Sequence, residues 1–196
     1  NSLEIINKFS EKILIKKKNR SSEFSAFNQI DLIIEAFKLS TGEIICLLDG
    51  DDFFLPNKIS VINHHFSENS EIDVIFDTPG IDINGKTKPL KLKKKLFNSN
   101  WPSTVPTSGI SFRRSFFDQC LKSDLLRKYP ILEIDFRLNF FSKKIHNRYI
   151  HLKDYLTFYR KVDNGIMSNL KKFSYKWWVK RLDAHHFIEH IYNVNN

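Results

Sequence analysis

Hydrophobic residues along the chain recur at helical spacing in some segments and in short continuous runs in others. Apolar side chains at helical intervals predict helices over residues 3–9, 28–39, 57–66, 115–126 and 135–141. Short apolar runs, rich in β-branched or aromatic residues, predict strands over residues 12–16, 44–48, 74–76, 109–112 and 155–159. Helices that alternate with strands are typical of an α/β fold with a mostly parallel sheet flanked by helices.

An aromatic-rich segment near the end of the sequence predicts a C-terminal amphipathic helix over residues 175–192. Two interpretations of its aromatic residues stand side by side. Trp177 and Trp178 either rest on a membrane surface or pack against the domain. We favour packing, because Val179, Leu182 and Phe187 complete an apolar stripe. The chain has no internal repeat and no second domain boundary, so we expect one domain over residues 1–196.

The charge balance favours an anionic partner. Lys and Arg number 31 against 22 Asp and Glu, which gives a formal net charge of +9. Such a balance suits a nucleotide, a nucleic acid or an acidic membrane face, although a solvated lysine-rich surface would give the same count. Two cysteines do not make a disulfide framework, and no apolar stretch approaches the roughly 18 residues that a transmembrane helix needs. We therefore expect a reducing, cytoplasmic location.

Three carboxylates follow directly on the apolar run at residues 44–48, in the order Asp49-Gly50-Asp51-Asp52. Ligands of open α/β sheets bind at the carboxyl ends of strands. Clustered carboxylates repel one another unless a cation lies among them, and Mg²⁺ or Mn²⁺ takes oxygen ligands while it keeps positions for phosphate oxygens. The cluster therefore suits a nucleotide diphosphate that binds through a metal.

Other interpretations of this cluster remain open from the residues alone. A surface Asp-Gly turn would look the same, and phosphoryl-transfer sites also place acids at strand ends. An EF-hand loop is excluded, because position 12 counted from Asp49 is Ser60, where a Glu is required.

A second motif, at residues 80–87, satisfies the P-loop pattern in full with the sequence Gly-Ile-Asp-Ile-Asn-Gly-Lys-Thr. A P-loop must open a helix that holds the phosphates at its N-terminus. Here Pro89 follows two residues after Thr87, and apolar residues alternate with polar ones before Asn84-Gly85, which predicts a hairpin turn. A P-loop nucleotide-binding protein is kept as the rival hypothesis.

The segment around the acidic cluster resembles glycosyltransferase family 2. Over residues 40–59 it reads Ser-Thr-Gly-Glu-Ile-Ile-Cys-Leu-Leu-Asp-Gly-Asp-Asp-Phe-Phe-Leu-Pro-Asn-Lys-Ile. This order is similar to the family's small-Gly-Glu turn, buried strand, Asp-x-Asp-Asp cluster, aromatic, Pro and basic residue. Weaker likenesses lie at residues 25–28, where Phe27 replaces the usual Arg, and at residues 74–86, 106–114, 133–138 and 156–160.

The resemblance implies a GT-A fold, which is Rossmann-like, and an inverting transfer from a nucleotide-sugar donor to an acceptor hydroxyl. Asp49, Asp51 and Asp52 would bind the nucleotide sugar, with Asp51 holding Mn²⁺ or Mg²⁺. Asp135 would be the catalytic base, because an aromatic residue and a Leu follow it at the family's spacing. Ile134 is inserted between Glu133 and Asp135, so Glu133 does not have that spacing. Asn1-Ser2 resembles the end of a loop after the family's first strand, so that strand is expected to be missing here.

The resemblance also divides the chain and names its partners. Residues 1–90 would bind the nucleotide sugar, residues 91–165 would face the acceptor, and residues 168–196 would form the C-terminal helix. We expect a glycan or lipid-linked acceptor, no nucleic acid, and a place in surface polysaccharide or glycan synthesis. A cytoplasmic location at the inner face of the membrane, with peripheral membrane contact, fits these partners. A degenerate, non-catalytic relative is the remaining alternative.

Overall fold

The computed structural model describes residues 2–83, 86–89, 103–123, 126–160 and 171–194. Its six α-helices, in chain order, are α1 Ser2–Asn7, α2 Ser25–Leu39, α3 Lys58–Glu68, α4 Arg114–Lys122, α5 Ile134–Phe140 and α6 Tyr175–Val194. A 3-10 turn, η1, covers Thr107–Gly109, and the π-helical turn η2, Phe141–His146, extends α5. Among the described residues, no helix combines the length and the hydrophobicity that crossing a membrane requires.

Among the described residues, eight short strands form two four-stranded sheets. The first sheet has the order β1-β6-β3-β7, with β1 at Ile44–Cys46, β6 at Ile110–Arg113, β3 at Val74–Phe76 and β7 at Tyr149–His151. The second has the order β2-β8-β4-β5, with β2 at Phe53–Phe54, β8 at Thr157–Arg160, β4 at Gly80–Ile83 and β5 at Lys86–Pro89.

The expected α/β fold with sheets flanked by helices is confirmed, and the pairing of strands within each sheet is mixed. In the first sheet β6 is antiparallel to both β1 and β3, and β3 is parallel to β7, so three of the four strands point the same way. In the second sheet β8 and β4 are parallel, while β2 and β5 run against them. The fold is therefore α/β with mixed sheets, because β6 is inserted between strands that would otherwise pair in parallel.

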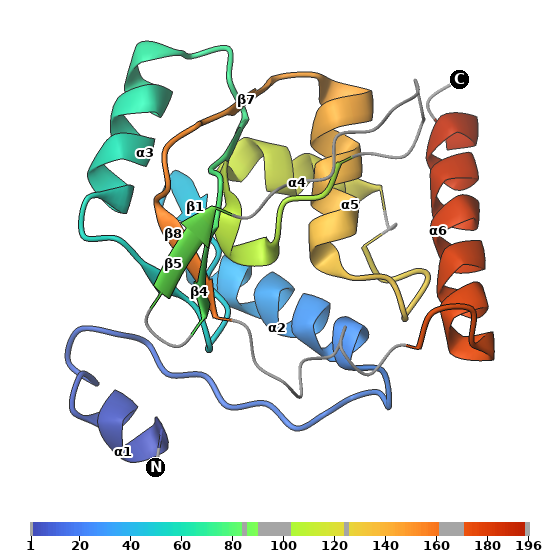
Figure 1. The fold of residues 1–196 in the computed structure, drawn as a ribbon, viewed down its shortest axis with the longest axis horizontal. Coiled ribbons are helices and arrows are strands. Elements are labelled where there is room, and N and C mark those ends of the chain that lie inside the picture. Colours follow the sequence, from blue (N-terminus) through green and yellow to red (C-terminus); the bar gives the residue numbers. More distant parts are fainter. Residues whose placement is uncertain (1, 84–85, 90–102, 124–125, 161–170, 195–196) are drawn as a thin grey trace.

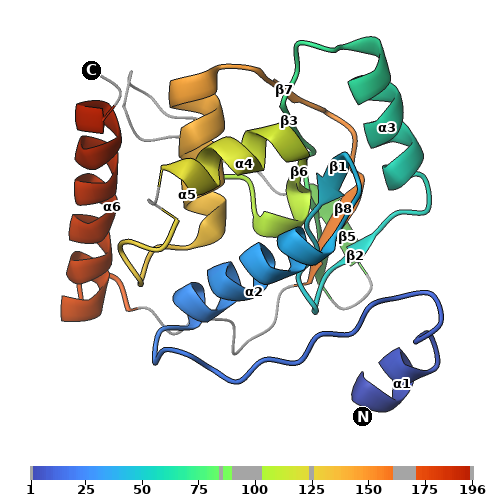
Figure 2. The ribbon, with the colours of Figure 1, turned by 180° about the vertical axis from the view of Figure 1, so that it is seen from behind.

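Helices cover both faces of the first sheet (Figures 1 and 2). Along β3, Val74 and Phe76 belong to the larger core, whereas Ile75 between them belongs to the smaller one. The larger core gathers buried side chains of α2, α4, α5 and α6, many of them phenylalanines. The smaller core lies beneath α3 and contains Ile62 and Phe66. This alternation is what a strand that is buried on both faces requires.

Most predicted elements are present with shifted ends, but the strand expected at residues 12–16 is wrong. That segment has no regular structure, and the side chains of Ile13 and Leu14 are exposed. Its apolar run finds no described strand to pair with. The C-terminal helix forms as expected, with Phe187 buried, but Leu182 is exposed instead of packed.

The structure also rules out the P-loop. Residues 80–83 and 86–89 pair as antiparallel strands, with Ile83 opposite Lys86 and Asp82 opposite Thr87. Residues 84–85, where the turn was predicted, lie outside the described residues, but the strands on either side of them meet the expectation of a hairpin. A strand stands where a P-loop needs the first turn of a helix, so no helix N-terminus is available here for phosphates.

Candidate functional site

The acidic cluster begins three residues after β1 ends, at the edge where β1 meets α2 and the turn η1. The backbone N–H of Asp49 donates a hydrogen bond of 2.9 Å to Ser108 Oγ. Gln29 Nε2, from α2, donates to Asp49 Oδ1 at 2.8 Å. Two elements distant in the sequence therefore fix the position of the first carboxylate.

Asp52 is held by the same serine and by the second sheet. Ser108 Oγ donates to Asp52 Oδ2 at 2.6 Å, and the backbone N–H of Arg160 donates to Asp52 Oδ1 at 3.0 Å. The N–H of Asp52 donates in turn to the carbonyl of Asp49 at 3.1 Å. Ser108 thus accepts from one end of the turn and donates to the other, which closes residues 49–52 into a fixed loop.

Asp51 differs from its two neighbours, because its side chain is exposed and makes no hydrogen bond or ion pair within the described part of the chain. Its carboxylate is therefore available to a ligand from solvent. Asp49 and Asp52 are half-buried, and their oxygens are already engaged by protein donors.

The electrostatics of the cluster favour a cation. Burial raises the pKa of Asp49, and the negative charge of Asp52 raises it further. Burial also raises the pKa of Asp52, with Ser108 acting in the opposite direction and the charge of Asp51 adding to the rise. The charge of Arg160 acts against the rise at Asp52, and a divalent ion would further relieve the repulsion among the carboxylates.

A metal could be held here through few protein ligands. The described residues contain no group of three or more His, Cys, Asp or Glu side chains placed to hold an ion. Mg²⁺ commonly binds through one or two carboxylates together with waters and substrate phosphates. The exposed carboxylate of Asp51 fits that mode, so these residues are compatible with a metal that arrives with a diphosphate.

A buried ion pair supports the turn that carries Ser108. Lys58 Nζ donates to Asp77 Oδ2 at 2.7 Å, to the carbonyl oxygen of Ser108 at 2.7 Å, and to Thr157 Oγ1 at 2.6 Å. Gly109 follows Ser108, and a Cβ there would lie 2.7 Å from Val105 Cγ1, so only glycine fits. The position of Ser108, and with it that of the acidic loop, depends on this buried network.

Asp135 lies in the first turn of α5, as predicted. Burial raises the pKa of its carboxyl group to about 7, and the charges of Glu133 and Asp49 add to the rise. The backbone N–H of Phe136 and the ammonium group of Lys180 act in the opposite direction. Glu133 does not share this position, since it precedes the helix and forms an ion pair with Lys180 on α6. A carboxyl group whose pKa lies near neutrality is suited to proton transfer.

Comparison with known proteins places this site in a family. The family model of glycosyl transferase family 2 matches residues 1–129, which include the acidic loop and Ser108. The chain belongs to glycosyltransferase family 2. A search of curated proteins found no match.

Solved structures agree with this glycosyltransferase family 2 chain in fold. S. aureus TarS 1–349 in complex with UDP-GlcNAc superposes with a TM-score of 0.64 at 18% identity, over 93% of this chain and 52% of that one. S. aureus TarS matches with a TM-score of 0.54 at 15% identity, over 83% of this chain and 29% of that one. The family 2 chain therefore spans about half the length, or less, of these structures.

The four predicted carboxylates of the family 2 chain all act electrostatically on one tyrosine that the sequence interpretation did not select. Burial raises the pKa of Tyr159 on β8, and the charges of all four add to the rise: Asp52, Asp51, Asp49 and Asp135. The structure thus brings Asp135 to the same region as the acidic loop, although the two lie more than 80 residues apart in sequence. In the sequence, Tyr159 belongs only to the weaker likeness to the family at residues 156–160.

Ser108 and Gln29 are further site residues that the sequence interpretation missed. Ser108 lies in the segment 106–114 that resembles the family, which was a signal, but its bridge between Asp49 and Asp52 depends on a contact across 56 residues. Gln29 lies in the predicted helix of residues 28–39 and carried no signal of its own.

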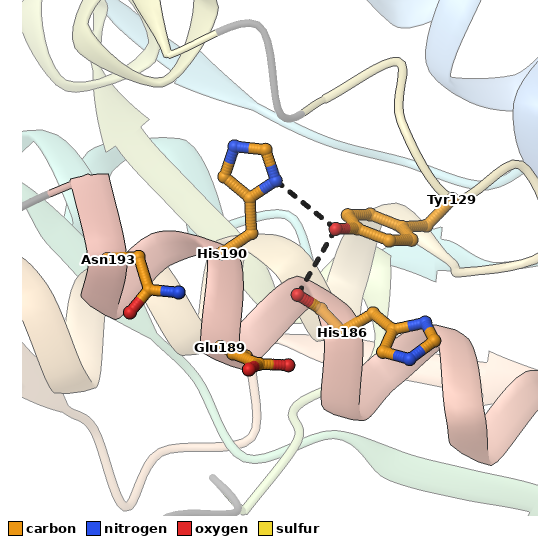
Figure 3. A pocket seen from close by; sticks show the side chains of 5 residues that line it. All are labelled: Tyr129, His186, Glu189, His190 and Asn193. Atoms are coloured by element: carbon orange, nitrogen blue, oxygen red, sulfur yellow. Dashed lines mark hydrogen bonds between the residues drawn. The ribbon is translucent and has the colours of Figure 1, made fainter.

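A hollow of about 260 Å³ adjoins the acidic loop. Its lining combines the polar side chains of Gln29, Asp49 and Thr107 with apolar side chains of α2 and of residues 47–48. A larger pocket of about 330 Å³ lies between α6 and Tyr129 (Figure 3). There Tyr129 Oη donates to the carbonyl of His186 at 3.1 Å and lies 3.3 Å from His190 Nδ1. None of the predicted carboxylates lines this larger pocket, so the hollow beside Asp49 is the candidate site.

Proposed function

We propose that the chain is the catalytic part of an inverting glycosyltransferase, which moves a sugar from a nucleotide-sugar donor to an acceptor hydroxyl. The observation that carries the proposal is the meeting of two kinds of carboxyl group at one place. Asp49, Asp51 and Asp52 form a loop with one exposed carboxylate. The pKa of Asp135 is about 7, and the charge of Asp49 contributes to raising it.

In this proposal the acidic loop binds the donor. Asp51 holds Mn²⁺ or Mg²⁺ together with the diphosphate, while Asp49 and Asp52 keep the loop in shape and lie beside the ribose or the diphosphate. The metal, when bound, would stabilise the negative charge that develops on the leaving nucleoside diphosphate. The protein supplies the fixed backbone turn, because Ser108 ties both ends of the loop together.

Asp135 takes the proton in the chemical step. Its carboxylate accepts the proton of the acceptor hydroxyl while the acceptor oxygen forms a bond to the anomeric carbon. The bond from that carbon to the diphosphate oxygen breaks on the opposite face, and the configuration inverts. Because its pKa lies near 7, Asp135 is basic enough to receive the proton and acidic enough to be ionised in an appreciable fraction at neutral pH.

A division of labour along the chain is part of the proposal. Residues 1–90 would bind the donor, residues 91–165 would face the acceptor, and α6, at Tyr175–Val194, is the C-terminal helix. A solved structure of similar fold was crystallised with UDP-GlcNAc, which makes a UDP-sugar the first donor to test here. The acceptor is a glycan or a lipid-linked sugar, in surface polysaccharide or glycan synthesis at the cytoplasmic face of the membrane.

Donor binding tests the proposal. Thermal unfolding would be followed with a panel of nucleoside diphosphates and nucleotide sugars, UDP-GlcNAc among them, each with and without Mn²⁺, and with ATP as the control. We expect at least one nucleotide sugar to raise the melting temperature only when Mn²⁺ is present, since a ligand that binds the folded state stabilises it. If every nucleotide sugar leaves the melting temperature unchanged while ATP raises it, the chain is not a sugar-nucleotide enzyme.

A further inference from the structure

Helix α6 carries apolar side chains on two opposite faces. Ala184, Phe187, Ile188 and Ile191 are buried against the core and account for one face. Tyr175, Trp178 and Leu182, here called the outward stripe, recur at intervals of three and four residues, so they share a second face. Since 3.6 residues make a turn, this second face lies on the far side of the helix from the core.

The outward stripe is exposed to solvent. Tyr175 is 84% exposed, Trp178 56% and Leu182 54%. Helix α6 lies at the side of the molecule next to α5, and none of the other described helices or strands covers its outer side in either view (Figures 1 and 2). Large apolar side chains that are contiguous and exposed mark a surface that another body covers.

Phe173 extends this surface beyond the start of the helix. Its ring is 63% exposed and lies 5.3 Å from the ring of Trp177 and 6.3 Å from that of Trp178, between centroids. Its backbone has a φ of 65°, in the left-handed region that a bulky residue seldom adopts. Ser174 then begins the helix, since its Oγ accepts from the N–H of Trp177. The Phe173 ring therefore lies against the two tryptophan rings at the start of α6.

The charged side chains of residues 171–182, the segment that carries the outward stripe, are all basic, and the first acidic residue beyond them is Asp183. Residues 171–182 contain five basic side chains and no acidic one. Lys180 forms an ion pair with Glu133, and Arg181 stacks over the ring of Trp177 at 4.5 Å. Lys171, Lys172 and Lys176, here called the basic rim, are exposed, with the ammonium of Lys172 4.9 Å from the centre of the Phe173 ring.

We propose that the outward stripe and the basic rim dock this chain on an anionic lipid bilayer. Tryptophan and tyrosine are enriched at the level of lipid headgroups, and basic residues beside them are attracted to anionic headgroups. Another protein surface fits less well, because lysine is depleted in the cores of protein interfaces. A soluble polyanion would pair with the lysines but would leave Trp178 and Leu182 in water. This inference does not depend on the proposed transfer reaction.

Vesicle co-sedimentation of the whole chain tests the proposal. The vesicles would contain phosphatidylcholine alone, or equal parts of phosphatidylcholine and phosphatidylglycerol. We expect binding to the mixed vesicles only, and weaker binding as the salt concentration rises. The double variant Trp178→Ser/Leu182→Ser should bind at least about tenfold more weakly, because apolar area is no longer withdrawn from water. The triple variant Lys171→Gln/Lys172→Gln/Lys176→Gln should lose roughly 100-fold.

Matched controls distinguish binding through this surface from non-specific binding of the chain to vesicles. Ile59 on α3 is 57% exposed, so Ile59→Ser removes a comparable apolar side chain elsewhere. Replacement of three exposed lysines outside the basic rim removes the same charge: Lys122→Gln, Lys128→Gln and Lys153→Gln. Both controls should bind the mixed vesicles much more tightly than their matched variants. All these side chains are exposed, so the urea midpoint of each variant should stay at that of the parent chain and exclude misfolding.

Three outcomes would overturn the proposal. The parent chain would fail to sediment with the mixed vesicles, or the stripe variant would bind as tightly as the Ile59→Ser control. The third outcome has two parts. Polyphosphate would bind the chain through the basic rim, and Trp178→Ser/Leu182→Ser would bind both vesicles and polyphosphate as tightly as the parent chain does. That last result would assign the surface to a soluble polyanion.

Discussion

Lys58 Nζ lies 2.7 Å from Asp77 Oδ2, and neither side chain is exposed to solvent. The same ammonium group donates to Ser108 and Thr157, so its three protons are all used. Burial lowers the pKa of Lys58, and the charge of Asp77 opposes that shift. Because Ser108 also ties the two ends of the acidic loop together, one buried ion pair serves both the core and the candidate site.

Removal of the lysine should therefore be costly. Lys58→Met would leave Asp77 as an unpaired buried charge, and we expect the free energy of unfolding to fall by about 3–5 kcal/mol. The double variant Lys58→Met/Asp77→Ala should recover part of this loss, because no lone charge then remains. Urea denaturation measures both, with Lys122→Met at an exposed position as the control, for which a change within about 0.5 kcal/mol is expected. A loss for Lys58→Met no greater than that of the control would contradict the structure.

Asp51 should behave in the opposite way, because its exposed carboxylate supports no other part of the protein. Asp51→Ala should change the free energy of unfolding by less than about 0.5 kcal/mol. It should nevertheless abolish the Mn²⁺-dependent binding of a nucleoside diphosphate, since one carboxylate fewer remains to hold the metal. Calorimetry with and without Mn²⁺ measures this, with Asp154→Ala as the exposed control. Unchanged metal-dependent affinity in Asp51→Ala would remove the metal assignment.

Asp135→Asn should separate activity from stability. Transfer should fall by roughly 10² to 10⁴-fold, the usual contribution of a general base, while donor binding is kept. Equal activity in the variant would point to Glu133 or to another residue as the base.

The difference in the free energy of unfolding between Asp135→Asn and the parent should depend on pH in a predictable direction. The pKa of Asp135 is about 7 in the folded protein, against an ordinary value of 3.8. The folded state therefore binds more protons than the unfolded state between these values, and its stability falls as the pH rises from about 4 to 7. Asn carries no charge, so Asp135→Asn should be more stable than the parent above pH 7, by up to about 4 kcal/mol. Thermal unfolding at pH 5 and pH 8 checks this, and an equal effect at both values would contradict it.

Local patterns predicted local structure well. The strand Val74–Phe76 was found within its predicted bounds, since a continuous apolar run between polar residues leaves little choice. The run at residues 12–16 looked equally apolar, yet it forms no strand, because a strand depends on a partner that the sequence does not name. On α6, helical spacing was compatible with either of two apolar stripes, and only packing decided that Phe187 is buried and Leu182 exposed.

Some residues of the candidate site could likewise be predicted from the sequence, and others could not. Asp49, Asp51 and Asp52 could be predicted because they are adjacent and follow a strand. Ser108 and Tyr159 could not, because each reaches the acidic loop through contacts across more than 50 residues. The ion pair of Glu133 with Lys180 likewise joins two helices that the sequence does not place together.

Lys86 tests the rejected P-loop directly. In a P-loop this lysine would contact the nucleotide phosphates, and Lys86→Ala would destroy binding. Here Lys86 begins β5, which pairs with β4, so we expect nucleotide affinity to be unchanged and the free energy of unfolding to shift by less than about 0.5 kcal/mol. Equilibrium binding of ATP and of the preferred nucleotide sugar, in parent and variant, measures this. A large loss of ATP binding would revive the rival hypothesis.

The ion pair between Glu133 and Lys180 should tune the pH dependence of the reaction in two directions. The charge of Glu133 raises the pKa of Asp135, and the charge of Lys180 lowers it. Both side chains are about one-fifth exposed, so water screens these effects only in part. Glu133→Gln should therefore lower the pKa of the base, and Lys180→Met should raise it.

The profile of kcat/KM against pH reports this pKa for the free enzyme. The rate should rise with pH as Asp135 loses its proton, so Glu133→Gln should be more active than the parent below pH 7 and Lys180→Met less active. Glu189→Gln is the control, because Glu189 is exposed on α6 and is not among the groups that shift Asp135. A purely structural role for the ion pair would lower the rate in both variants at every pH and leave the midpoint of the profile in place. Shifts of opposite sign would instead show that Asp135 is the group whose ionisation limits the reaction, and that α6 takes part in setting it.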